Sequence, residues 1–141
     1  MKRALAFILV LCIVLSSSTV AIASNSAVER ASPTLSGYSA NLNSYEDGKI
    51  VVMYEVSART SENCTLGIEN IEFFDSNGTP VLTVEGTVSN GLIRTGVRSW
   101  PGAFEQGLPS RRHYYAEVTV FAKIGSEYDS KTITTAKIFV E

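Results

Sequence analysis

Hydrophobic and polar residues alternate along most of the chain after residue 31, a pattern typical of β-strands with one buried face. The alternation predicts strands over residues 38–42, 48–59, 66–74, 80–88, 92–100, 113–125 and 130–140. No segment after the N-terminal region sustains the 3.6-residue period of a helix. In the last two predicted strands the core-facing positions are Tyr114, Ala116, Val118, Val120 and Ala122, then Ala136, Ile138 and Val140.

Turn-forming residues separate these segments. Asp75-Ser76-Asn77-Gly78 predicts a tight hairpin turn, because Asn-Gly tolerates the positive φ that such turns require. Asn90-Gly91 and Gly125-Ser126 predict two further turns. Pro80 cannot donate a backbone hydrogen bond, which favours an edge position for the strand it begins. Alternation breaks at Glu69-Asn70, where we expect a β-bulge.

About seven short strands within residues 32–141 predict one all-β domain, a two-sheet antiparallel sandwich of immunoglobulin or fibronectin type III type. A small barrel is the alternative. The alternation pattern does not distinguish the immunoglobulin strand order from that of fibronectin type III.

The chain from Leu108 onward resembles the last two strands of a fibronectin type III module. Leu108-Pro109, then Tyr114, then the segment 118–122 (VTVFA) and Gly125 stand where that family has a Leu-Pro corner, a strand-opening Tyr, V-x-V-x-A and a Gly-containing turn. The resemblance implies a tyrosine corner, with the Tyr114 hydroxyl bonded to upstream backbone, and solvated residues at Arg111 to His113. In layout the whole chain is similar to short secreted proteins of Gram-positive bacteria that are grouped as domains of unknown function.

The N-terminal residues predict a secretion signal. A basic start at residues 1–3 precedes an apolar run and then Ala21-Ile22-Ala23, which fits the A-x-A cleavage rule. We therefore expect a signal peptide over residues 1–23 and a flexible lead-in over 24–31. The signal peptide is the one segment expected to interact with a membrane. An uncleaved anchor is the alternative, and Cys12 lies too early in the run for a lipoprotein. The expected location is extracellular, in a bacterium.

Charge and cysteine content narrow the function classes. The chain has 12 basic and 14 acidic residues, and loss of the signal leaves 10 against 14, scattered without a basic stripe. This pattern does not favour nucleic acid or an anionic membrane as a partner. Cys64 would be the one cysteine of the mature chain, so we expect no internal disulfide and a buried thiol.

Catalytic and metal-binding motifs are lacking in the sequence. His113 is the one histidine, which excludes HExxH and other multi-histidine zinc sites, and no G-x-S-x-G motif is present. A Cys64–His113 dyad would need contact across two separate strands. We therefore predict no catalytic, metal or cofactor-binding residues and no enzyme activity; an enzyme with converging carboxylates would be the exception.

Aromatic residues are the candidate contact groups. Strand parity places Phe74, Tyr115, Phe121 and Phe139 on the outside of one sheet, where they would form an aromatic stripe for a partner or for cross-strand packing. Trp100 and Phe104 lie in a Gly- and Pro-rich segment expected to be a loop, where they either cap the core or contact a partner.

These observations favour a non-enzymatic secreted protein for extracellular recognition of a protein or glycan, or for cell-surface structure. The alternative is a small secreted effector or toxin acting on other cells. The absence of a cationic amphipathic segment speaks against a membrane-lytic version of that alternative. The sequence does not identify the ligand or the oligomeric state.

Overall fold

The computed structural model describes residues 32–45 and 48–141, so the expected signal peptide and lead-in over residues 1–31 lie outside the described residues. Within the described ranges the chain forms nine β-strands. They are β1 (Leu35–Ser44), β2 (Lys49–Ala58), β3 (Cys64–Asp75), β4 (Pro80–Glu85), β5 (Ile93–Thr95), β6 (Ser99–Gly107), β7 (Arg112–Ile124), β8 (Glu127–Thr134) and β9 (Ile138–Val140).

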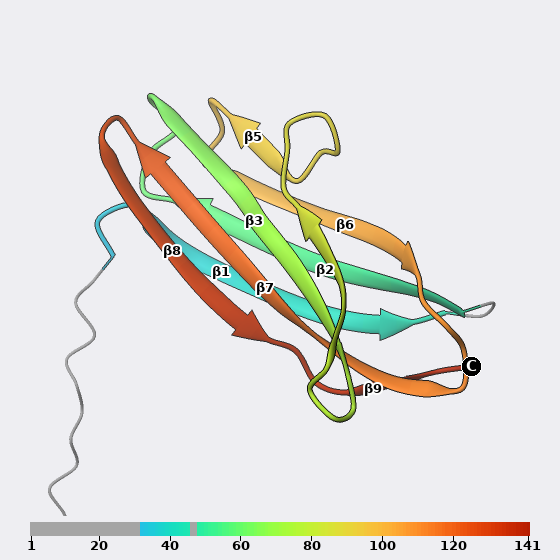
Figure 1. Ribbon diagram of the computed structural model, residues 1–141. Helices are drawn as coiled ribbons and strands as arrows, with labels where there is room; N and C mark the ends of the chain where they lie inside the picture. Colours follow the sequence, from blue (N-terminus) through green and yellow to red (C-terminus); the bar gives the residue numbers. More distant parts are fainter. Residues whose placement is uncertain (1–31, 46–47) are drawn as a thin grey trace, which may run out of the picture. The chain divides into compact units, whose positions relative to one another are not determined.

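The strands form two antiparallel sheets (Figure 1). The three-stranded sheet has the order β1-β2-β6, and the larger sheet has the order β4-β3-β7-β8. β5 extends the larger sheet by pairing with β3, and β9 pairs with β7 beyond the end of β8. The predicted all-β two-sheet sandwich is confirmed, with nine strands in the described residues where the sequence predicted about seven.

One hydrophobic core fills the space between the sheets. It takes alternate residues of β1 and β2 from one side and of β3 and β7 from the other. On β7 the five predicted positions, Tyr114, Ala116, Val118, Val120 and Ala122, are all buried. Every second residue of the strand therefore faces the core, as the alternation of hydrophobic and polar residues predicts.

The start of β7 is fixed by a tyrosine corner. The Tyr114 hydroxyl donates a hydrogen bond to the Pro109 carbonyl at 2.9 Å, as predicted. Tyr114 is 1% exposed, so this bond supplies the partner that a buried phenol requires. Arg112 and His113 are exposed as expected, and they are the first residues of β7, where they pair with Val140 and Phe139 of β9.

The predicted turns and bulge of the larger sheet are confirmed. The register of β3 shifts between Ile68 and Asn70. The Asp75 carbonyl and carboxylate hold the β3–β4 hairpin, and Gly78 has a φ of 82°. Pro80 begins β4, an edge strand, where its missing N–H leaves no gap in a ladder.

The expected loop after Trp100 is instead a strand. β6 runs from Ser99 to Gly107 and pairs with the whole of β2, so it completes the three-stranded sheet. Pro101 is tolerated because β6 is an edge strand. Gly102 is needed because a Cβ there would lie 2.4 Å from the Tyr54 ring. Proline and glycine therefore mark an edge and a close approach here rather than a loop.

The expected strand over residues 130–140 is two strands. β8 and β9 pair one after the other with β7, and Thr135 marks the break. The Thr135 N–H donates to the Ala116 carbonyl at 2.9 Å, and its hydroxyl accepts from the Ala116 N–H at 2.9 Å. This break shifts the alternation, so Ala136 is exposed and the prediction that it faces the core is wrong. Ile138 and Val140 do pack toward the core.

Candidate recognition surface

Phe74 and Tyr115 form a stacked pair on the outer face of the larger sheet. They are register partners on β3 and β7, and their ring centroids are 5.1 Å apart with planes 13° from parallel. Both side chains are half-buried. Lys137, between β8 and β9, places its Nζ 5.6 Å from the Tyr115 ring centre and donates a hydrogen bond to the Ser76 carbonyl at 3.2 Å.

Phe139 is the most exposed of the six candidate aromatics, at 46%. It lies opposite His113 in the pairing of β9 with β7, and the two ring centroids are 5.0 Å apart. His113 and Tyr115 are two residues apart on β7 and therefore share one face of the strand. Phe74, Tyr115, His113 and Phe139 thus form a row across three neighbouring strands.

Phe121 does not belong to this row. It is on the outer face of β7, but it is only 8% exposed, because the Tyr128 ring stacks on it at 5.8 Å. The Tyr128 hydroxyl donates to the Glu69 carboxylate at 2.7 Å, and burial and this neighbour raise the pKa of Tyr128. The expectation of Phe121 as an exposed contact group is wrong.

The outer face between Tyr115 and Phe121 is polar. Glu117 and Thr119 occupy the intervening outward positions on β7, and the Thr119 hydroxyl lies 3.0 Å from that of Thr132 on β8. The four aromatics predicted to form one stripe are therefore divided into a terminal row and a separate Phe121–Tyr128 pair. Strand parity correctly predicts that these side chains point outward from the sheet, but it does not show which neighbouring side chains cover them.

Trp100 and Phe104 pack against the core from β6, which is the capping alternative. The Trp100 indole N–H donates to the Gly91 carbonyl at 3.0 Å, and the Arg94 guanidinium lies 4.4 Å from the ring centre. Arg94 covers one face of the indole by a cation–π contact, so that face is not open to a partner. Tyr54 shares the Gly91 carbonyl, and burial raises its pKa.

Several exposed groups were missed by the sequence reasoning. Tyr45 and Met53, 55% and 50% exposed, line a hollow of about 910 Å³ together with Phe139. Met53 was detectable from parity, since it alternates with the inward residues of β2. Lys137 was not detectable, because its contact with Tyr115 depends on the break between β8 and β9.

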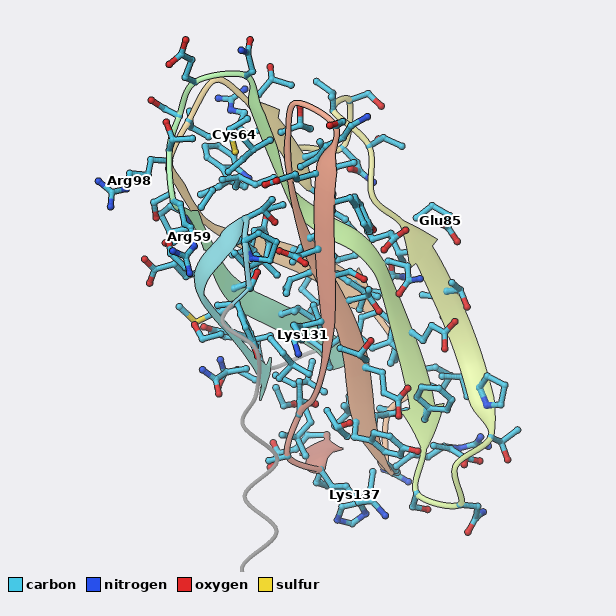
Figure 2. All side chains as sticks on the ribbon, turned by 90° about the vertical axis from the view of Figure 1, so that its left-hand side faces the viewer. Arg59, Cys64, Glu85, Arg98, Lys131 and Lys137 are labelled. Carbon is cyan, nitrogen blue, oxygen red and sulfur yellow. The ribbon has the colours of Figure 1, made fainter. Side chains whose placement is uncertain are left out.

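The predicted lack of a Cys64–His113 dyad agrees with the positions of the two residues. Cys64 pairs with Ile124 at one end of β7 and His113 lies at the other end, roughly 35 Å away along an extended strand. Figure 2 shows Cys64 near one end of the sandwich and Lys137, close to the His113 end, at the other. Cys64 is 2% exposed, and burial raises the pKa of its thiol.

Within residues 32–45 and 48–141, no three His, Cys, Asp or Glu side chains lie close enough together to bind a metal ion. In the same part of the chain no helix has the length and hydrophobicity needed to cross a membrane.

The fold places the protein in the class of two-sheet antiparallel β-sandwiches. The chain matches no described protein family, and no curated protein matches its sequence. Among solved structures it is similar to the crystal structure of a Bordetella pertussis protein described as ApaA, with a TM-score of 0.47 and 10% sequence identity. The similarity covers 76% of this chain and 93% of that chain.

Proposed function

We propose that the protein is a secreted, non-enzymatic module for recognition at a cell surface, and that it binds through the outer face of its larger sheet. The observation that carries this proposal is the row of Phe74, Tyr115, His113 and Phe139. Aromatic side chains provide large contact areas at low cost in side-chain entropy, which is why they dominate recognition surfaces. The N-terminal residues support export, because they have the order of a signal peptide.

Within the sandwich class, the strand order supports a fibronectin type III-like rather than an immunoglobulin constant-type module. In the immunoglobulin constant type the fourth strand joins the sheet of the first and second. Here β4 pairs with β3 in the other sheet. The Tyr114 corner fits the sandwich class as a whole, so the strand order is the observation that supports this assignment.

Retention of the protein on cell-envelope material tests the proposal. We expect the full chain to be retained, and we expect Phe139→Ser to weaken retention because Phe139 is 46% exposed in the row. Tyr38→Ser is the matched control, since Tyr38 is 42% exposed but lies on β1 of the other sheet. Equal retention of the Phe139→Ser variant and the parent protein would remove the row as the contact surface.

A further inference from the structure

A polar hollow of about 390 Å³ lies beside Tyr115 on the outer face of the larger sheet. Its walls come from the tip of the β3–β4 hairpin, from β7, and from the end of β8 with the following linker. The lining residues are Ser76, Asn77, Gly78, Tyr115, Glu117, Thr134, Thr135 and Lys137. The volume is within the range of roughly 300–1,000 Å³ that is common for small-ligand sites.

The walls of this hollow are held in place by hydrogen bonds. The Asp75 carboxylate accepts from the N–H groups of Asn77 and Thr79, each at 2.9 Å, which fixes the hairpin tip. On the opposite wall, Thr135 is bonded twice to the Ala116 backbone. Lys137 is tied to the Ser76 carbonyl and so bridges the two walls. A site built on fixed walls loses little entropy when a ligand binds.

Four polar side chains offer hydrogen-bonding capacity to the hollow. They are the Asn77 amide, the Tyr115 phenol, the Glu117 carboxylate and the Thr134 hydroxyl. Within the described residues none of these four groups has a hydrogen-bond partner in the protein, and the Tyr115 hydroxyl lies 3.6 Å from where a Cβ on Gly78 would be. The hollow therefore presents donors and acceptors together in a small space.

The charges of the hollow favour a neutral ligand. Lys137 and Glu117 contribute one positive and one negative charge, so neither a simple anion nor a simple cation gains net attraction. Apolar side chains are absent from the described lining except for the Tyr115 ring, which gives a peptide no pocket for an apolar anchor. A neutral, hydroxyl-rich molecule is the class that matches these groups.

We propose that this hollow binds a sugar residue of a polysaccharide. Hydroxyl groups of the sugar donate to Glu117 and accept from Lys137, while Asn77 and Thr134 bond to neighbouring hydroxyls. This inference rests on the proposed recognition function and names its ligand class. It places polar groups beside the row of aromatics, because Tyr115 belongs to both the row and the hollow.

Treated envelope material separates a sugar from a protein ligand. Retention of the full chain is measured on untreated envelope, on envelope oxidised with periodate to cleave vicinal diols, and on protease-digested envelope. We expect periodate to abolish retention and protease to leave it. Loss after protease with no effect of periodate would overturn the sugar ligand and leave recognition intact. No retention on untreated envelope would overturn the proposed function itself.

Two variants connect the ligand to the hollow. Lys137→Met keeps the aliphatic stem and removes the charge, and Tyr115→Phe removes only the phenol oxygen; we expect affinity for untreated envelope to fall about tenfold for Lys137→Met and less for Tyr115→Phe. Lys123→Met is the matched control, because Lys123 is exposed on the same face of β7 outside the hollow. Equal affinity of the Lys137→Met and Lys123→Met proteins, with both folded, would overturn this site.

Discussion

The carboxylate of Asp129 on β8 accepts two hydrogen bonds from Thr34, 95 residues earlier in the chain. The Thr34 N–H lies 2.9 Å and its hydroxyl 2.8 Å from Asp129 Oδ2, and the Ser32 hydroxyl donates to the same oxygen. Arg59 adds a bond from Nε to the Ser32 carbonyl at 2.8 Å. These contacts fasten the segment before β1, in the three-stranded sheet, to an edge of the larger sheet.

Removal of the charge at Asp129 tests the strength of this connection. Asp129→Asn can keep an oxygen at the place of Oδ2, which accepts all three bonds, but it removes the negative charge that strengthens them. We therefore expect the free energy of unfolding to fall by about 1 kcal/mol. Glu127→Gln is the control, because Glu127 is an exposed acid on the same strand. Urea unfolding followed by circular dichroism measures both. An Asp129→Asn protein as stable as the Glu127→Gln protein would contradict the prediction.

The same connection predicts a pH dependence. The bond from Ser32, followed by that from the Thr34 backbone, lowers the pKa of Asp129 below its ordinary value of 3.8. A carboxyl group with a lowered folded pKa stabilises the fold fully above its unfolded pKa and loses that effect as the pH falls through the folded pKa. The stability difference between the parent and Asp129→Asn should therefore be constant near neutral pH and shrink below pH 3.8. A difference that persists unchanged in strong acid would show that Asp129 acts through packing.

The fold class followed from alternation because β7 and β2 each have one face in the core. Every second residue of Tyr114 to Ala122 had to be apolar, and it is. The hairpin at Asp75 was predicted for a local reason as well, since Asn77-Gly78 has a backbone requirement that is independent of the rest of the fold. Features determined by neighbouring residues in the chain could thus be predicted.

Features determined by distant neighbours could not be predicted. Phe121 is outward by parity, but its burial depends on the Tyr128 ring from β8. The sequence predicts a loop at β6 because proline and glycine are usual in loops. Pro101 is accepted in the strand because β6 is an edge, and Gly102 because the Tyr54 ring occupies the space of a Cβ. The hollow at Lys137 likewise requires the register of three strands.

We predict that Trp100 stabilises the packing of β6 against the core and does not bind a partner. Trp100→Phe keeps an aromatic ring but removes the bond to the Gly91 carbonyl, so we expect a loss of about 1 kcal/mol in the free energy of unfolding. Arg94→Met removes the cation from the indole face and should cost less than about 1 kcal/mol. Circular dichroism measures unfolding in both. Arg98→Met, at another exposed arginine near β6, is the control.

The Tyr114 corner gives a further stability prediction. Tyr114→Phe leaves the ring in the core and removes the hydroxyl that bonds to Pro109 at 2.9 Å. The Pro109 carbonyl can turn to water, so we expect a loss of about 1 kcal/mol in the free energy of unfolding. Tyr115→Phe, the next residue on β7, is the control because no protein partner for its phenol occurs in the described residues. Equal stability of the two variants would contradict a stabilising corner.

Addition of a methyl group should destabilise the protein at one glycine of β6 and not at another. A Cβ at Gly102 would lie 2.4 Å from the Tyr54 ring, which is 6% exposed and held in the core. Since this ring cannot move without displacing its neighbours, Gly102→Ala should lower the free energy of unfolding by about 1–3 kcal/mol. Nothing lies within 4 Å of a Cβ at Gly107, so Gly107→Ala should be neutral or slightly stabilising. Thermal unfolding of the two variants is the measurement, and equal melting temperatures would mean that β6 does not pack against Tyr54 as described.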